Sequence, residues 1–205
     1  LITESADYPQ GLRRVFKENF VKLSGNIVAD ETYNPEDTDF RTQVAKAKAS
    51  NPDILYIVPQ APPKGILLVK QITESGLKAQ LLTAEVLIGR NVIEENAGDF
   101  EGLIGVEQEF DETNPKARAL FAKYKKITGE KAPFPTYMAG AYDIVYLIAD
   151  AIRMNGYNSE KIRDYLYSVR NYDGATANLT LDMHGDPILD FSVKQIRDGQ
   201  LLILR

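Results

Sequence analysis

The chain has 205 residues, 44% of them hydrophobic, and its 24 basic and 29 acidic residues give a formal net charge of -5. That length allows one large domain or two small ones, with enough apolar residues for a sizeable core. The two signs of charge are mixed without a basic stripe, which argues against nucleic acid or an anionic membrane as the partner.

Cysteine is absent, so the sequence excludes disulfides, thiolate metal sites and cysteine nucleophiles. No apolar run reaches the ~18–20 residues that a membrane-spanning helix needs, and no signal peptide is recognisable. Leu1 and Ile2 have the character of the end of a strand whose beginning is missing. We therefore expect the chain to be a fragment of a longer protein.

A first helix is expected after the polar turn at residues 3–7, because Pro9 suits the first helical turn. Gly25 is a good left-handed stop for this helix, and a short strand over 27–33 is expected next. The buried face of the helix is predicted from its apolar spacing at Leu12, Val15, Phe16, Phe20 and Leu23.

The clearest helix–strand unit of the sequence follows. Phe40, Val44 and Ala47 fall at i, i+4 and i+7 and predict one buried stripe of a helix. This helix ends before Pro52, because the residue that precedes a proline is pushed out of the helical region. The unbroken apolar run at 54–58 predicts a parallel strand that is covered on both faces.

Helices and strands continue to alternate, which predicts an α/β fold with a mainly parallel sheet. The helix at 136–155 is apolar nearly all round and needs protein on most of its sides. The remaining expected helices cover 64–75, 91–96, 115–128 and 159–169, and the remaining expected strands cover 80–83, 102–107, 178–181, 191–197 and 201–204.

Catalytic and cofactor signatures do not occur in the sequence: it has no glycine-rich phosphate loop, no nucleophile elbow and no HExxH helix. We therefore expect no catalytic residue, no metal and no cofactor. The single histidine, His184, lies in a turn sequence between strands, flanked by Asp182 and Asp186. A calcium loop needs more ligands than this turn supplies, so a plain hairpin turn is the expectation.

Polar and aromatic residues follow the ends of several predicted strands, at Tyr8, Gln60, Glu85 and the loop at 107–109. In open α/β sheets, ligands bind beyond the carboxyl ends of the strands. A carboxylate pairs with an ammonium group and aromatic rings cover aliphatic atoms, so this edge suits a small polar or cationic ligand. The alternative for each residue alone is an ordinary solvated loop residue.

A series of segments, taken in order, resembles the type I periplasmic binding proteins, and most closely the Leu/Ile/Val-binding group of ABC-transporter receptors. The segments are DYPQG, ETYNPEDTDFRTQVAKAKASNPDILYIV, KQITESGLKAQLL, NPKARALFAKYKKITGEKAPFPTYMAGAYDIVYLIADAI and DGATANLTLDMHGDPILDFSVKQIRDGQ.

The resemblance implies two α/β lobes, joined by three hinge strands, that close on a ligand. Residues 1–133 and 188–205 would form a Rossmann-like three-layer lobe, the second of the two, and 134–187 would return to the first lobe and form part of the hinge. Most of the first lobe is missing from this sequence. The helix at 136–155 is therefore expected to be exposed or packed against another copy of the chain.

The resemblance also implies the roles of individual residues. Tyr8 matches a tyrosine of a Tyr-Gly-x-Gly turn that lines the ligand cleft, although Pro9 replaces the first glycine here. Glu85, preceded by Ala84, lies where amino-acid receptors place the acid that binds the ligand's ammonium group. Tyr137 matches an aromatic residue that covers the ligand side chain.

Gln60 and Ala61 lie in a loop that supplies a further aromatic residue in branched-chain receptors. The sequence PQAPP has no aromatic residue at this place, which argues against branched-chain specificity.

The resemblance implies an extracytoplasmic receptor, periplasmic or lipid-anchored, that binds an amino acid or similar small metabolite and delivers it to an ABC-transporter permease. One alternative is the ligand-sensing domain of a signalling or regulatory receptor of the same fold. An enzyme of doubly wound fold is a further alternative, for which the sequence supplies no nucleophile, metal site or cofactor loop.

Overall fold

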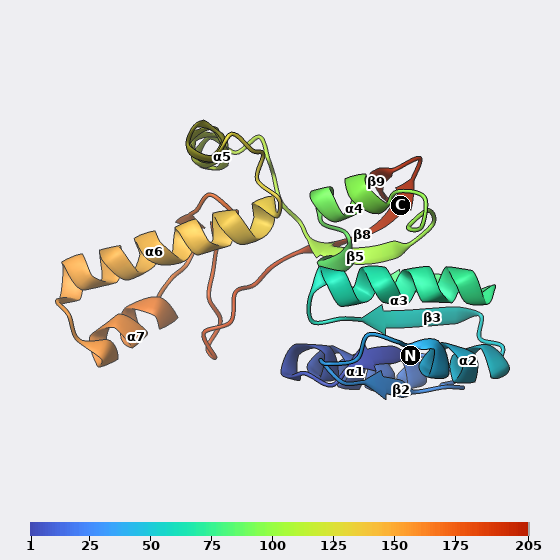
Figure 1. Cartoon of the computed structure of the whole chain (residues 1–205). Coiled ribbons are helices and arrows are strands. Elements are labelled where there is room, and N and C mark those ends of the chain that lie inside the picture. The colour runs from blue at the N-terminus through green and yellow to red at the C-terminus, as the bar shows by residue number, and fades with distance from the viewer. Residues whose placement is uncertain (205) are drawn as a thin grey trace. The chain divides into compact units, whose positions relative to one another are not determined.

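The computed structural model describes residues 1–204. Helices and strands alternate along the first part of the chain (Figure 1). The contacts divide the chain into two compact units. The first unit comprises Leu1–Glu107 and the segment from Ser192 on, and the second unit comprises Gln108–Phe191. The assignment of 1–133 and 188–205 to one lobe of a two-lobed receptor stays a prediction.

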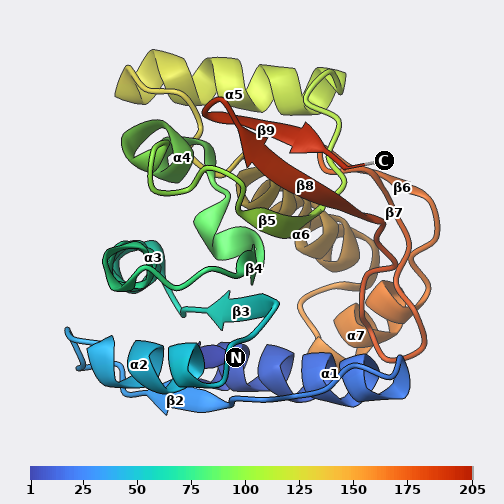
Figure 2. The same ribbon diagram turned by 90° about the vertical axis from the view of Figure 1, so that its right-hand side faces the viewer.

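A mainly parallel sheet of seven strands forms the middle of the first unit, in the order β2-β1-β3-β4-β5-β8-β9 (Figure 2). The pairs β2/β1, β1/β3, β3/β4 and β4/β5 are parallel, and β8/β9 is an antiparallel hairpin. The α/β prediction is thus confirmed. The strands are β1 Ile2–Glu4, β2 Glu31–Tyr33, β3 Ile54–Val58, β4 Gln80–Thr83, β5 Ile104–Gln108, β8 Phe191–Arg197 and β9 Gln200–Ile203.

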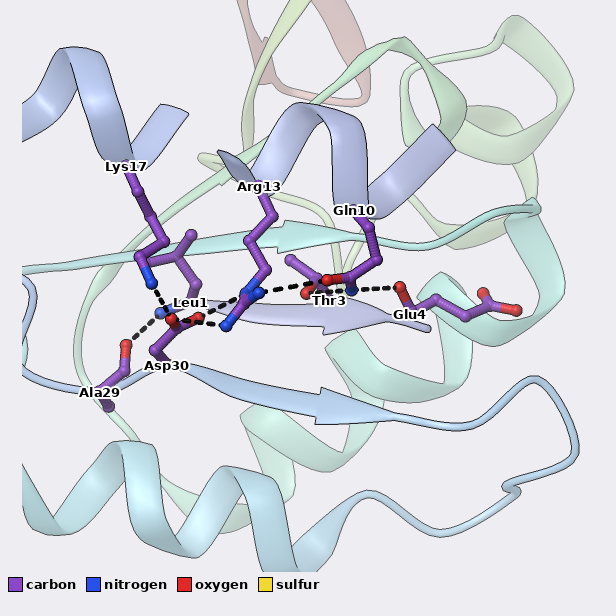
Figure 3. A network of polar contacts seen from close by, with 8 residues as sticks. All are labelled: Leu1, Thr3, Glu4, Gln10, Arg13, Lys17, Ala29 and Asp30. Carbon is purple, nitrogen blue, oxygen red and sulfur yellow. Dashed lines mark hydrogen bonds and ion pairs between the residues drawn. The ribbon is translucent and has the colours of Figure 1, made fainter. Parts of the chain in front are cut away.

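Helices cover both faces of this sheet. Figure 3 shows α1 on one side of β1, β2 and β3, and α2 on the other side. On the α1 side, the ring of Phe16 stacks on that of Tyr56 with centroids 4.3 Å apart. The three layers expected of a Rossmann-like lobe are therefore present. The helical elements are α1 Asp7–Lys22, α2 Arg41–Ala49, α3 Pro62–Ser75, the 3-10 turn η1 Glu85–Leu87 and α4 Arg90–Asn96.

The predicted stripe of α2 is confirmed, because Phe40, Val44 and Ala47 are all buried. The buried strand at 54–58 is also confirmed except at its first residue, since Ile54 is exposed. Burial of such apolar side chains contributes ~1.5–3 kcal/mol each, so these two elements hold much of the core of the first unit.

Helix α1 forms as predicted, but its predicted buried face is wrong at two places. Val15 and Leu23 are exposed, and Leu23 lies beyond the last helical residue. The other predicted residues, Leu12, Phe16 and Phe20, are half-buried. The left-handed residue after the helix is Ser24, with φ 67°, and not Gly25. Gly25 instead leaves room for a neighbouring ring, because a Cβ at this position would lie 2.4 Å from the ring of Phe20.

The second unit contains α5 Pro115–Thr128, α6 Pro135–Asn155, α7 Ser159–Tyr167 and a two-stranded sheet of β6 Tyr172–Asp173 and β7 Asn178–Leu179. Helix α5 begins where Asn114 accepts hydrogen bonds from the N–H groups of Lys116 and Ala117, as an N-cap does. It ends at Gly129, with φ 83°. Strand β6 was not predicted, and the expected strand at 178–181 is shorter than predicted.

Helix α6 buries only a narrow stripe, at Ala139, Asp143, Leu147 and Ala151. The carboxylate of Asp143 accepts hydrogen bonds from the backbone N–H groups of Ala175, at 2.6 Å, and Thr176, at 2.8 Å. These bonds satisfy a buried charge that would otherwise be costly. On the other sides of the helix, Ile144, Val145 and Met154 are exposed, whereas Met138, Ile148 and Ile152 are half-buried.

The turn at His184 is a plain turn, as predicted. The side chain of Asp182 accepts hydrogen bonds from the N–H groups of His184 and Asp186, and these bonds lower the pKa of Asp182. Leu181 and Pro187 form an isolated antiparallel bridge that closes the turn. Within residues 1–204, no helix is long and apolar enough to cross a membrane.

Candidate functional site

Tyr8 and Glu85 meet at the carboxyl edge of the sheet of the first unit. Tyr8 lies in the first turn of α1, directly after β1, and Glu85 opens η1, directly after β4. The hydroxyl of Tyr8 donates a hydrogen bond to Oε1 of Glu85 at 2.5 Å. Because β1 and β4 both border β3 and all three are parallel, their following residues converge, as the sequence predicted.

The bond between these two residues is of the strong type, since hydroxyl-to-carboxylate bonds are charge-assisted and short. The charge of Glu85 also acts on Tyr56 of β3. Burial raises the pKa of Tyr56 to about 12, and the carboxylate of Glu85 adds to this effect. Tyr56 is therefore neutral at physiological pH.

The loop at Gln60 and Ala61 follows β3 at the same edge. Both side chains are exposed, and Ala61 is the extended N-cap residue of α3. The backbone N–H of Gln60 donates to Oε2 of Glu4 at 2.8 Å, which fixes the position of the loop. Ala84, the N-cap residue of η1, is buried.

Glu4 is a residue of this edge that sequence reasoning missed. It is the last residue of β1 and only 4% exposed, and its Oε2 also accepts a hydrogen bond from the hydroxyl of Tyr33 at 3.4 Å. Burial raises the pKa of Tyr33, and the charge of Glu4 raises it further. An acidic residue at the end of an apolar strand was the available signal.

The backbone of Glu4 is held as firmly as its side chain. The amide of Gln10 on α1 donates to the carbonyl oxygen of Glu4 at 2.7 Å and to Oγ1 of Thr3 at 3.2 Å (Figure 3). Helix α1 is thus tied to β1 beside Tyr8. These bonds fix the backbone at the end of β1.

The acidic loop after β5 adds less negative charge to the carboxyl edge than its composition indicated. Glu107 forms an ion pair with Lys194 of β8 at 2.6 Å, so a basic partner already neutralises its charge. The backbone N–H of Glu109 bonds to the carbonyl of Asp190.

Tyr137 belongs to α6 of the second unit, is 54% exposed and has its ring 6.0 Å from that of Phe134 in an edge-to-face arrangement. Its predicted role as a cover for the ligand stays a prediction, as do the ligand contacts of Tyr8, Gln60, Ala61, Ala84 and Glu85.

Comparison with known proteins adds independent information. The sequence model of a family described as "Periplasmic binding protein" matches residues 1–200. A "Leu/Ile/Val-binding protein homolog 1" of Brucella abortus is 27% identical over 192 residues, covering 92% of this chain and 50% of the relative. A protein of the same name from Brucella suis is 23% identical over 190 residues, with the same coverage of 92% and 50%. The chain thus spans about half the length of the curated relatives it matches.

Solved structures share the fold over the whole chain. A leucine-binding protein LivK from Thermotoga maritima matches with a TM-score of 0.84 and 26% identity, covering 100% of this chain and 59% of that protein. LivJ from Streptococcus pneumoniae, solved in complex with isoleucine, matches with a TM-score of 0.79 and 23% identity, covering 99% and 59%.

The resemblance inferred from the sequence segments is therefore confirmed, and the relatives are binding proteins rather than enzymes. Since the family model matches nearly all of its residues, the chain belongs to the periplasmic binding protein family.

Proposed function

We propose that this chain is part of an extracytoplasmic solute-binding receptor whose ligand is an amino acid or a similar small metabolite. The observation that carries the proposal is the pair formed by Tyr8 and Glu85 at the carboxyl edge of the sheet. A carboxylate held by a tyrosine hydroxyl is a fitting partner for an ammonium group, and the tyrosine ring offers a surface for aliphatic atoms.

The ligand class follows from the charge of this edge. Glu85 places a carboxylate at this edge, where the hydroxyl of Tyr8 donates a hydrogen bond to it. The names of the relatives, which include Leu/Ile/Val-binding proteins, support an amino acid as the ligand. The loop at Gln60 and Ala61 offers no aromatic side chain, so we expect a ligand other than the large branched-chain amino acids.

The receptor would work by closure of two lobes rather than by chemistry. A ligand that contacts both lobes shifts the population towards the closed form, because only that form offers both sets of contacts. In this proposal Tyr137 covers the side chain of the bound ligand. The closed receptor then delivers its ligand to the permease of an ABC transporter, and the receptor itself is periplasmic or anchored by a lipid.

The test begins with a ligand screen. Thermal shifts of a receptor that carries both lobes would be measured against amino acids, amides and small carboxylates, since binding to the native state raises its apparent stability. In the same receptor, Glu85→Gln should weaken amino-acid binding by about 3–5 kcal/mol if Glu85 pairs with a buried ammonium group.

A second variant tests whether Tyr8 holds the carboxylate of Glu85 in position. Tyr8→Phe keeps the ring and the charge of Glu85 but removes the hydroxyl that bonds to it. It should weaken amino-acid binding by about 1.5–3 kcal/mol, the contribution of a hydrogen bond to a charged group. Calorimetry that shows unchanged amino-acid affinity in Glu85→Gln would remove Glu85 from the ligand site.

We further propose that the exposed apolar face of α6 allows this chain to self-associate. Ile144 and Val145 are 61% and 66% exposed, and adjacent apolar side chains of this kind on a soluble protein commonly mark an interaction surface.

A further inference from the structure

Helix α5 differs in charge from the rest of the chain. Its 14 residues, Pro115–Thr128, include five basic residues and no acidic one. Since the whole chain has 24 basic and 29 acidic residues, the remainder has 19 basic and 29 acidic residues and a net charge of -10. The even mixture of charges, from which the sequence argued against an anionic membrane as the partner, therefore does not extend to this helix.

One side of α5 packs against other residues of the second unit. Ala117 is buried, and Leu120, Phe121 and Tyr124 are half-buried. The ring of Phe121 lies edge-on to that of Phe110, with the ring centroids 5.9 Å apart. These contacts determine which side of the helix faces solvent.

Four of the five basic side chains of α5 lie on the outward side. They are Arg118, Lys123, Lys125 and Lys126, which are all exposed. In the part of the chain that the structure describes, none of the four forms an ion pair with a carboxylate, whereas the fifth, Lys116, pairs with Asp173 at 2.9 Å. We call the four residues the α5 basic face.

The α5 basic face is convex. Lys123 and Lys126 are three positions apart and therefore adjoin on the helix surface, and Arg118 and Lys125 lie two turns apart on the other flank. Side chains diverge from such a surface, whereas a site for one small molecule needs groups that converge in a hollow. The face therefore suits an extended anionic surface rather than a single small anion.

An anionic lipid bilayer offers an extended surface of this kind. Each Lys or Arg close to such a bilayer strengthens binding roughly fivefold. The attraction acts over a Debye length of ~8 Å at physiological ionic strength, so more distant acidic residues oppose it little. Since a helix of this length spans about 21 Å, the α5 basic face can meet several lipid head groups at once.

An exposed apolar side chain adjoins the α5 basic face. Ile127 is 74% exposed and lies four positions after Lys123, so the two side chains are neighbours on the helix surface. Helices that bind to membrane surfaces combine basic side chains with apolar ones that enter the boundary between head groups and acyl chains. Ile127 therefore favours a lipid surface over an acidic polypeptide as the partner.

We propose that the α5 basic face binds the protein reversibly to an anionic lipid surface, with Ile127 in contact with the lipid. The lipid class is one whose head group has a net negative charge, such as phosphatidylglycerol. This binding does not depend on the ligand site at Tyr8 and Glu85, so either proposal can be disproved without the other.

The experiment measures cosedimentation of the 205-residue chain with vesicles of phosphatidylcholine, prepared with and without phosphatidylglycerol. The chain should bind only the vesicles that contain phosphatidylglycerol. Binding should fall at least tenfold between ~0.1 M and ~1 M salt, because the Debye length shortens from ~10 Å to ~3 Å. The double variant Lys123→Gln, Lys126→Gln should bind about twentyfold more weakly, because two cations are lost.

The matched control is the double variant Lys22→Gln, Lys78→Gln, which removes two exposed lysines of the first unit and changes the net charge equally. It should bind as the parent chain does. Equal weakening by the two double variants would overturn the proposal, as would equal binding with and without phosphatidylglycerol, or no binding at all. Tighter binding to polyglutamate than to the phosphatidylglycerol vesicles would also overturn it, because the partner would then be an acidic polypeptide.

Fluorescence tests the contact of Ile127 with the lipid. The chain has no tryptophan, so Ile127→Trp introduces a single reporter, and Val21→Trp on α1, at a position that is 57% exposed, is its control. The emission of Ile127→Trp should shift to shorter wavelength with phosphatidylglycerol vesicles, and that of Val21→Trp should stay unchanged. No shift in Ile127→Trp, or equal shifts in both variants, would contradict the proposal.

Discussion

At the residue scale, Asp30, just before β2, joins two basic side chains of α1 to the sheet. Its two carboxylate oxygens accept hydrogen bonds from Nε and Nη2 of Arg13, both at 2.7 Å, and Lys17 adds a further ion pair (Figure 3). The side chain of Asp30 is only 19% exposed. This arrangement ties α1 to the segment that enters β2.

Burial alone would raise the pKa of Asp30, but the hydrogen bonds from Arg13 and Lys17 outweigh burial, and the pKa lies below its ordinary value. The unfolded chain therefore takes up the proton more readily than the folded chain. The stabilisation is present above the unfolded pKa of ~3.9 and is lost as the pH falls through the folded value.

Asp30→Asn should accordingly lower the free energy of unfolding by about 1–2 kcal/mol at pH 7, a value reduced for the partial exposure of both basic partners. The difference from the parent chain should shrink as the pH falls below about 4. Urea denaturation followed by circular dichroism at several pH values measures both effects.

The control for this prediction is Glu18→Gln on the same helix. Glu18 pairs with Arg14 at 3.4 Å, and both side chains are more than half exposed, so its loss should change the stability by less than about 0.5 kcal/mol. A destabilisation by Asp30→Asn that is the same at pH 3 and pH 7 would contradict an electrostatic origin.

At the element scale, the ends of the helices depend on a few special residues. Helix α3 ends at Gly76 in the left-handed conformation, with φ 70°, where a side chain is strained. Gly11, in contrast, lies inside α1, and a Cβ there would meet no atom within 4 Å.

The same substitution should therefore have opposite effects at the two glycines. Gly76→Ala should destabilise the chain by about 1 kcal/mol, whereas Gly11→Ala should stabilise it by about 0.5–1 kcal/mol, since alanine favours a helix interior. Thermal unfolding of the two variants measures the contrast, and a shift of Tm in the same direction for both would refute it.

Elements with strong local signals could be predicted from the sequence. The stripe of Phe40, Val44 and Ala47 and the cap at Asn114 are local patterns, and both are present. The exposure of Val15 and Leu23 could not be predicted, because the apolar spacing of α1 does not show how little of the helix the sheet covers. Strand β6 has only two residues, too few for a periodic pattern.

The meeting of Tyr8 and Glu85 could be predicted because parallel strands end at one edge, whatever their order in the sheet. The burial of Glu4 could not, since it depends on the N–H of Gln60 and the hydroxyl of Tyr33, which are distant in the sequence. Sequence patterns thus predicted the carboxyl edge of the sheet, but not the buried carboxylate of Glu4, which holds the loop at Gln60.

At the scale of the whole molecule, the proposed self-association through the exposed face of α6 can be tested by mutation. The double variant Ile144→Glu, Val145→Glu should weaken self-association at least tenfold, because the burial of two such side chains exceeds the ~1.4 kcal/mol that corresponds to a factor of ten. Sedimentation velocity over a range of concentrations measures the change.

The control variant is Ile127→Glu on α5, which changes an equally exposed apolar residue outside the α6 face. It should leave the association constant as in the parent chain. If the parent chain sediments as a monomer at high concentration, the proposed self-association is wrong.

The sheet of the first unit is completed by residues from the far end of the chain. The N–H of Gly102, just before β5, bonds to the carbonyl of Ile196 in β8, and the N–H of Ile196 bonds to the carbonyl of Leu103. These partners lie nearly a hundred residues apart in the chain. During synthesis, the edge of β5 therefore stays unpaired until the second unit and then β8 have been made. During that interval the unpaired edge of β5 can pair with a strand of another nascent chain. A chaperone that covers this edge would prevent such mispairing.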